Sequence, residues 1–144
     1  MMERLFHLLA SIHNRLFGSK RLLPHEKLCL DSWRDSLTNH AKNVLDAQLA
    51  SLQFVQRQAA GAKVCFYFWK SKTPPLFDQA APDLKVATVV LETSNGEQMP
   101  AKIYVHRGRF FSIEFPKRPD RFLEQYGMTG LLLKLAEVNV HVDL

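Results

Sequence analysis

The chain has 144 residues, of which 47% are hydrophobic and 23% are charged, and its formal net charge is +5. This composition excludes disorder over most of the length and suits one domain, residues 1–144, with a core of useful size. The basic excess falls short of that of a dedicated nucleic-acid-binding protein, and it also suits an acidic protein partner or an anionic membrane surface.

Two features bear on the cellular setting. The cysteines Cys29 and Cys65 have neither a CxxC nor a metal-ligand spacing, so we expect no metal site and a reducing, cytoplasmic environment. Glu3, His7 and His13 interrupt the apolar run at the N-terminus, which excludes a signal peptide. No stretch approaches the roughly 18 apolar residues that a membrane-spanning helix needs, so we expect no transmembrane segment.

Residues 2–17 are predicted to form an amphipathic helix that ends at Gly18. Apolar residues recur there at steps of three and four, namely Met2, Leu5, Leu9, Ile12 and Leu16. Such a helix packs on its own domain, lies on a membrane surface or covers a groove on a partner. We therefore treat residues 1–18 as an amphipathic element, either packed or an appendage, and as the candidate surface for self-association.

The next region begins at Pro24 and is predicted to form a helix from near His25 or Asp31 to about Asp46, with Asp31 as the cap of its main part. Segment 45–58 fits both helical spacing and strand alternation, and the sequence leaves the two alternatives open. The small residues at 59–61 stand directly before an aromatic and branched run and favour a hairpin. We therefore predict strands at about 51–58 and 64–69.

A proline-rich stretch follows. Pro74 and Pro75 cannot donate hydrogen bonds to a strand ladder, so residues 71–82 are predicted to form a loop. Long loops inside compact domains often carry function. We therefore count this loop, with its Phe77, among the candidate binding surfaces.

The rest of the chain alternates strands and tight turns. We predict strands at 84–92, 98–105, 110–115 and 137–144, and a short helix at 120–126. Asn95-Gly96 is typical of a two-residue type I′ turn, and Arg107-Gly108 is predicted as a second two-residue turn. N-terminal helices followed by such strands predict an α+β fold with an antiparallel β-meander of about five to six strands.

Two such turns would pair Val90 with Ala101 and place Ala101 opposite Glu114. Glu114 would then lie at the edge of an apolar face. This makes it the best single candidate for an acid or base, since an unpaired buried carboxylate has a raised pKa. We expect a structural role instead, with a nearby Lys or Arg holding the carboxylate, because His106 falls on the other face.

Segment 102–121 supports an alternative function. It holds two acidic residues, Glu114 and Asp120, and six basic ones, namely Lys102, Arg107, Arg109, Lys117, Arg118 and Arg121. Basic strands with exposed aromatic residues bind nucleic acids. The strand alternation, however, puts Phe110 and Phe111 on opposite faces, so these two rings cannot form one stacking platform.

No motif of a known enzyme class appears, since the chain lacks the GxSxG, P-loop, HExxH and dinucleotide-binding patterns. We therefore predict a non-catalytic module, without a cofactor, that binds another protein. Its candidate binding residues are Arg107, Arg109, Lys117, Arg118 and Phe77. A nucleic-acid-binding module that uses segment 102–121 is the alternative, and an enzyme without a recognisable motif is the third reading.

Overall fold

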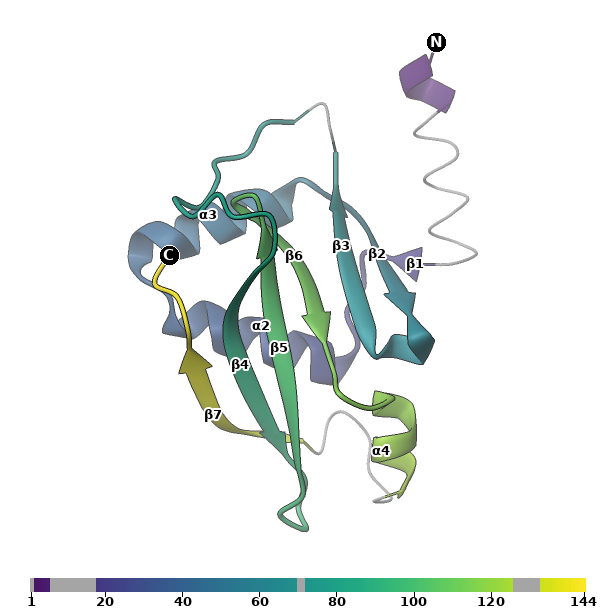
Figure 1. Cartoon of the computed structure of the whole chain (residues 1–144). Helices are drawn as coiled ribbons and strands as arrows, with labels where there is room; N and C mark the ends of the chain where they lie inside the picture. The colour runs from purple at the N-terminus through teal and green to yellow at the C-terminus, as the bar shows by residue number, and fades with distance from the viewer. Residues whose placement is uncertain (1, 6–17, 70–71, 126–132) are drawn as a thin grey trace.

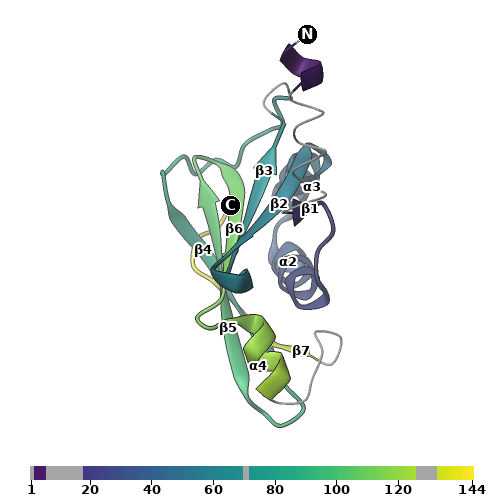
Figure 2. The same ribbon diagram turned by 90° about the vertical axis from the view of Figure 1, so that its right-hand side faces the viewer.

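The computed structural model describes residues 2–5, 18–69, 72–125 and 133–144. Within these residues the chain forms an antiparallel sheet with two long helices on one of its faces (Figure 1, Figure 2). The predicted α+β class and antiparallel sheet are confirmed. None of the helices in this part of the chain is long and apolar enough to cross a membrane.

The described strands lie in the order β1-β2-β3-β6-β5-β4-β7. Their bounds are Gly18–Ser19 (β1), Leu52–Gln58 (β2), Lys63–Phe68 (β3), Leu84–Glu92 (β4), Gln98–His106 (β5), Arg109–Glu114 (β6) and Lys134–Val140 (β7). The hairpin β2–β3 and the unit β4–β5–β6 each follow the chain, but β3 pairs with β6. The strands therefore do not form one continuous meander, because the loop over 69–83 carries the chain past two strand positions before β4 begins (Figure 1).

The region predicted as one helix forms two. These are α2 (Pro24–Ser36) and α3 (Asn39–Ala50). Thr38 is the N-cap of α3, and its Oγ1 accepts a hydrogen bond from the Ala41 backbone N–H at 3.2 Å. This bond satisfies one of the N–H groups that the start of a helix leaves without a partner. The single-helix prediction is wrong because hydrophobic spacing continues across this cap, and Asp31, predicted as a cap, lies inside α2.

The core lies between the two helices and the inner face of the sheet. The Trp33 ring of α2 is centred 5.4 Å from Phe110 and 6.2 Å from Phe77, and the rings of Phe66 and Phe110 are 4.4 Å apart. All four residues are buried. Large aromatic side chains remove much apolar surface from water, so this cluster contributes strongly to stability.

The turn between β4 and β5 is longer than predicted. It runs from Thr93 to Glu97: the Thr93 N–H donates to the Glu97 carbonyl at 2.9 Å, and Thr93 Oγ1 accepts from the Glu97 N–H at 3.1 Å. Val89, and not Val90, therefore pairs with Ala101. The predicted register is wrong by one residue because the threonine side chain helps to close a wider turn than the Asn-Gly pair alone would form.

The turn between β5 and β6 has the two residues predicted, Arg107 and Gly108, with φ values of 48° and 79°. The buried Gln48 of α3 holds this turn. Its Nε2 donates to the carbonyl oxygens of Pro75 and Gly108 at 3.0 Å each, and its Oε1 accepts from the Phe110 N–H at 2.9 Å. One amide thus ties the helical layer to the hairpin and to the loop that precedes β4.

An irregularity in the pairing of β5 with β6 changes the surroundings of Glu114. The register shifts between Tyr104 and Val105, and Lys102 pairs with Glu114. The prediction that Ala101 lies opposite Glu114 is wrong. A β-bulge adds one residue to one strand and so changes which residues face each other beyond it.

The two ends of the chain complete the fold. Of the helix predicted over 2–17, only residues 2–5 lie within the described part, where they are helical; the rest of that prediction, including self-association through this helix, concerns residues outside it. The short helix predicted at 120–126 is α4 (Pro119–Gln125). The strand predicted at 137–144 is β7, which ends at Val140 because the N–H groups of His141 and Val142 both turn to the Val86 carbonyl.

Candidate interaction surface

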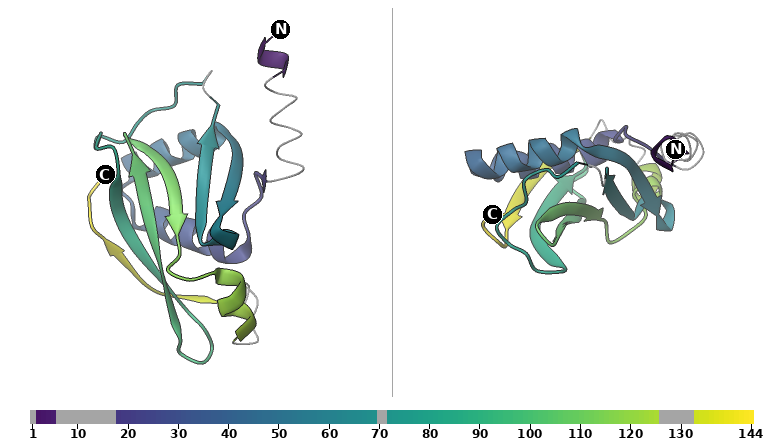
Figure 3. Two further views of the ribbon diagram at one scale, coloured as in Figure 1. Left: turned by 45° about the vertical axis from the view of Figure 1, so that its right-hand side comes forward. Right: turned by 90° about the horizontal axis from the view of Figure 1, so that it is seen from above.

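The face of the sheet turned away from α2 and α3 carries no helix of the described chain (Figure 2, Figure 3). We call it the outer face. Paired residues in neighbouring strands point to the same side of a sheet, and the pairing of β2, β3, β6 and β5 therefore defines the side chains of the outer face. They are Phe54, Gln56, Gln58, Lys63, Cys65, Tyr67, Ser112, Glu114, Lys102, Tyr104, His106 and Arg109. Phe111, which the register irregularity leaves unpaired, lies on the same face, because its ring contacts Tyr67 and His106.

Four aromatic side chains form a continuous row across this face. We call Phe54, Tyr67, Phe111 and His106 the aromatic row. Successive ring centroids are 4.8 Å, 6.4 Å and 5.8 Å apart, and the row crosses β2, β3, β6 and β5 in turn. The first three residues are half-buried, and the His106 side chain is 45% exposed. Contiguous apolar groups that remain partly open to water often mark interaction sites, so the aromatic row is a candidate binding surface.

The orientation of the rings limits what they can contact. Phe54 and Tyr67 are stacked, with an angle of 19° between their planes. Their centroid distance of 4.8 Å matches the spacing of neighbouring strands, about 4.8 Å. The two rings therefore stand side by side with their inner faces against each other and their edges toward solvent.

The charges around the row are mainly positive. Lys63 Nζ lies 3.5 Å from the Glu114 carboxylate and 5.8 Å from the centroid of the Phe111 ring. Lys102 and Lys85 are exposed, and neither forms an ion pair with a described residue. The acidic groups near the row are Glu114, which Lys63 offsets, and Asp83, which lies beside His106, while Lys85 and Lys102 add two further positive charges to this side of the sheet.

The phenol groups on the outer face remain neutral hydrogen-bonding groups. Burial raises the pKa of Tyr67, whose hydroxyl donates to Gln56 Oε1 at 3.2 Å. Burial, followed by the negative charge of Glu114, raises the pKa of Tyr104. Neither tyrosine is therefore prepared to act as a base near neutral pH.

The structure separates the predicted binding residues into two groups. Arg107 and Arg109 lie at the turn where the aromatic row ends, with Arg109 paired to His106. Lys117 and Arg118 follow the opposite end of β6, and a strand of that length spans roughly 20 Å. Segment 102–121 therefore does not form one compact basic cluster.

Phe77, the fifth predicted binding residue, lies in the core. It is 5% exposed and packs against Trp33, and its N–H donates to the Gly108 carbonyl at 2.8 Å. The loop after β3 therefore presents no Phe77 to a partner. Its aromatic side chain instead fixes the loop beneath the Arg107–Gly108 turn.

Glu114 is held by a lysine, as predicted, since Lys63 forms the ion pair described above. His106 turns to another group, and its Nδ1 lies 3.4 Å from the Asp83 carboxylate. Among the residues that the structure describes, no three His, Cys, Asp or Glu side chains gather in a way that could hold a metal ion. Glu114 and His106 therefore contact different charged neighbours, Lys63 and Asp83 respectively.

Two members of the aromatic row, Phe54 and Tyr67, were not among the predicted binding residues. Each was placed in a predicted strand, and the alternation Phe54, Gln56, Gln58 was visible. What was missing was the pairing of β3 with β6, which brings Tyr67 beside Phe111. Aromatic residues at the strand positions that alternate with buried ones include Phe54 and Tyr67, so strand alternation could have identified both residues. It could not have shown that the rings of the row contact one another.

Comparison with models of protein families, with curated proteins and with solved structures finds no match to this chain.

Proposed function

We propose that the protein is a non-catalytic module that binds an acidic protein partner through the outer face of its sheet. The observation that carries this proposal is the aromatic row, which links four strands and remains partly exposed. Aromatic residues are enriched at the centres of protein interfaces, where they give large contact areas. Lys63, Lys85 and Lys102 lie around this centre, and basic groups at the rim of an interface attract an acidic partner.

The ring geometry favours a protein over a nucleic acid. Sequence-tolerant binding of single strands relies on bases that stack on open ring faces. In the Phe54–Tyr67 pair each ring already covers one face of the other. The outward ring edges suit contact with aliphatic side chains and carbonyl groups of a protein. The separation of Arg107 and Arg109 from Lys117 and Arg118 likewise removes the compact phosphate-binding cluster that the nucleic-acid alternative requires.

The reduced state of both cysteines also supports a cytoplasmic setting for this partner. Cys29 and Cys65 are free and buried, and burial raises the pKa of both thiols. Buried, protonated thiols are typical of structural cysteines in reducing compartments.

Site-specific photocrosslinking tests the proposal. A benzoylphenylalanine in place of Phe54 reports on molecules that touch the row, and the same residue in place of Asn43, exposed on α3, reports on background contacts. We expect protein adducts at position 54 that are absent at position 43. The substitution Lys102→Glu should reduce them, whereas Lys42→Glu on the helical side should not, because only the first reverses a charge beside the row.

Two results would overturn the proposal. Adducts at position 54 that disappear after nuclease treatment would identify the ligand as a nucleic acid. Adducts that are the same at positions 54 and 43, or insensitive to Lys102→Glu, would show that the outer face selects no partner.

A further inference from the structure

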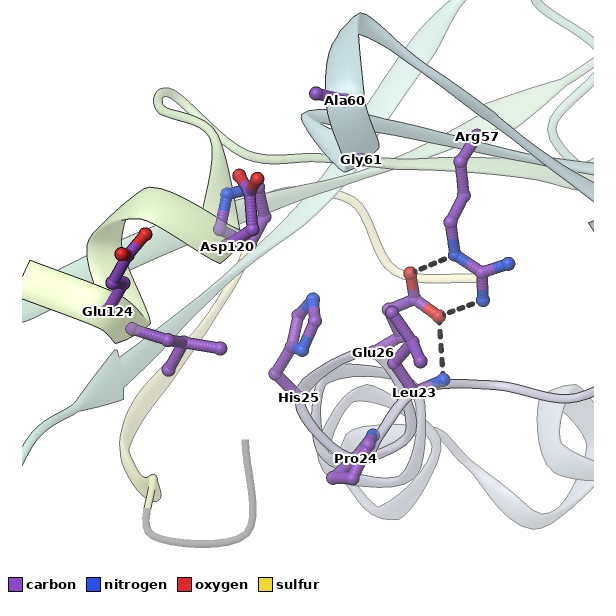
Figure 4. A pocket seen from close by; sticks show the side chains of 11 residues that line it. Leu23, Pro24, His25, Glu26, Arg57, Ala60, Gly61, Asp120 and Glu124 are labelled. Carbon is purple, nitrogen blue, oxygen red and sulfur yellow. Dashed lines mark hydrogen bonds and ion pairs between the residues drawn. The ribbon is translucent and has the colours of Figure 1, made fainter. Parts of the chain in front are cut away.

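A pocket of about 670 Å³ opens at the end of the sheet remote from the Arg107–Gly108 turn. It lies between the N-terminus of α2, the turn at 59–61 and α4 (Figure 4). Its volume falls in the range of small-molecule sites, roughly 300–1,000 Å³. The apolar side chains of its wall are Leu23, Pro24, Ala60, Pro119 and Leu123. This pocket is separate from the outer face and does not depend on the function proposed for that face.

A buried histidine faces this pocket without a hydrogen-bond partner from the described chain. His25 is 6% exposed, and its ring projects into the space between α2 and α4 (Figure 4). Its ring packs edge-on against Phe115, with centroids 5.4 Å apart. Burial lowers the pKa of His25, so the imidazole is neutral near pH 7 and offers one donor and one acceptor nitrogen. Buried polar groups normally have a hydrogen-bond partner, and a ligand in the pocket would supply it.

The positive charge in the wall is already neutralised. Arg57 Nε and Nη2 donate to the two carboxylate oxygens of Glu26 at 2.7 Å and 2.5 Å, and Glu26 Oε1 also accepts from the Leu23 N–H at 2.8 Å. A bidentate pair of this kind fixes both groups. Neither Arg57 nor Glu26 therefore contributes a net charge to a molecule in the pocket.

The opposite wall, on α4, carries two carboxylates, of which Asp120 is paired with Arg118 and Glu124 has no ion pair with a described residue. Asp120 and Glu124 both line the pocket (Figure 4). Asp120 accepts from Arg118 Nη2 at 2.8 Å, and this bond lowers the pKa of its carboxyl group. Glu124 is exposed and forms no ion pair with any described residue. An anion would meet repulsion here, whereas a cation would gain an attraction that the wall itself does not satisfy.

We propose that this pocket binds a small, mostly apolar amine. The ammonium group contacts the carboxylate of Glu124, the α4 carboxylate that Arg118 does not neutralise, and the apolar body lies on Leu23 and Leu123. His25 forms a hydrogen bond to the bound molecule. Apolar contact gives most of the affinity, and the Glu124 carboxylate selects the amine over neutral and acidic molecules of the same shape.

Three probes that differ only in charge test the proposal: benzylamine, benzyl alcohol and benzoate, titrated into the isotope-labelled chain and followed by NMR. Ligands of this size bind with dissociation constants on the order of millimolar. We expect benzylamine to shift the amide signals of residues 23–26 and 119–124 and the ring nitrogens of His25. Benzyl alcohol should bind more weakly, and benzoate should produce no shift in these residues.

The variant Glu124→Gln keeps the shape of the wall and removes its charge. It should weaken benzylamine about two- to fivefold, the effect expected for a partly exposed ion pair, and leave benzyl alcohol unchanged. The matched control is Glu97→Gln, which removes an exposed carboxylate from the turn after β4 and should change neither titration. Proton–nitrogen spectra of both variants verify that the fold is retained.

Three outcomes would overturn the proposal. The first is equal binding of benzoate and benzylamine, which would contradict the role of the α4 carboxylates. The second is equal loss of benzylamine and benzyl alcohol in the Glu124→Gln variant. The third is the absence of shifts at residues 23–26 and 119–124 with benzylamine at about 50 mM, a concentration well above a millimolar dissociation constant.

Discussion

The side chain of Gln48 lends itself to a quantitative test, because one amide makes three hydrogen bonds between separate parts of the fold. Its partners are the Pro75 and Gly108 carbonyls and the Phe110 N–H. The substitution Gln48→Leu removes all three bonds while keeping a side chain of similar volume. The Gly108 carbonyl retains another donor, the Phe77 N–H at 2.8 Å, so the largest loss falls on the Phe110 N–H.

The magnitude follows from these bonds. A buried N–H left without a partner costs about 1–3 kcal/mol, and the lost bond to the Pro75 carbonyl adds about 1 kcal/mol, whereas the Gly108 carbonyl keeps the Phe77 N–H as its donor. We therefore expect Gln48→Leu to lower the free energy of unfolding by about 2–4 kcal/mol. For a chain of this size that corresponds to a fall in Tm of roughly 6–12 °C.

Urea unfolding followed by tryptophan fluorescence measures this change, since Trp33 is 1% exposed and becomes solvated on unfolding. The matched control is Gln58→Leu, an exposed glutamine on β2, which should change stability by no more than about 0.5 kcal/mol. The variant Gln48→Glu keeps an acceptor for the Phe110 N–H but turns a charged oxygen toward two carbonyl groups, so it should destabilise at least as much as Gln48→Leu. A Gln48→Leu protein whose stability lies within 1 kcal/mol of the wild type would refute the role assigned to this amide.

Two further predictions concern Gly108 and His25. A Cβ at Gly108, whose φ is +79°, would lie 2.9 Å from the Phe77 carbonyl oxygen, whereas a Cβ at Gly96, whose φ is +83°, would meet nothing within 4 Å. In urea unfolding, Gly108→Ala should therefore be less stable than Gly96→Ala by about 1–3 kcal/mol. Equal stability of the two variants would contradict the close contact at Gly108. Burial lowers the pKa of His25 in the folded state below its usual value near 6.5. As the pH falls below 6.5, the His25 imidazole is therefore protonated in the unfolded chain before it is protonated in the folded chain. The free energy of unfolding should decrease from pH 7 toward pH 5 for this reason. His25→Gln should make that decrease smaller in unfolding measured at each pH, and an unchanged pH dependence would show that His25 is not its source.

The local structure of this chain could be read from the sequence wherever neighbours along the chain decide it. The alternation in β2, with Gln56 and Gln58 on one side and Val55 on the other, is a property of adjacent residues. The same holds for the turn at Arg107 and Gly108, where a glycine accepts positive φ without strain. The fold class followed from the order of such segments.

The features that the sequence did not reveal depend on residues far apart or on a single side chain. The wider turn after β4 depends on one hydroxyl, that of Thr93, and the break between α2 and α3 on another, that of Thr38. The pairing of β3 with β6 joins positions about fifty residues apart. Without that pairing neither the aromatic row nor the core position of Phe77 follows, because alternation alone specifies a side of a strand and not its neighbour.

The pairing of β3 with β6 also affects the mechanical stability of the sheet. This seam joins two units that each form from sequence neighbours, and it contains only the pairs Lys63–Glu114, Val64–Ile113 and Cys65–Ser112. Closing it costs more chain entropy than closing either hairpin, since the segment between its strands is long. The seam is therefore where the two units should separate from each other under load or local fluctuation.

The aromatic row crosses this seam where Tyr67 meets Phe111. A partner bound along the row would touch both units at once and hold them together across the junction between them. Occupancy of the outer face and cohesion of the two halves would then rise and fall together, because a ligand that binds only the joined form stabilises it by mass action. The partner would therefore bind the outer face only when the two units of the sheet are joined.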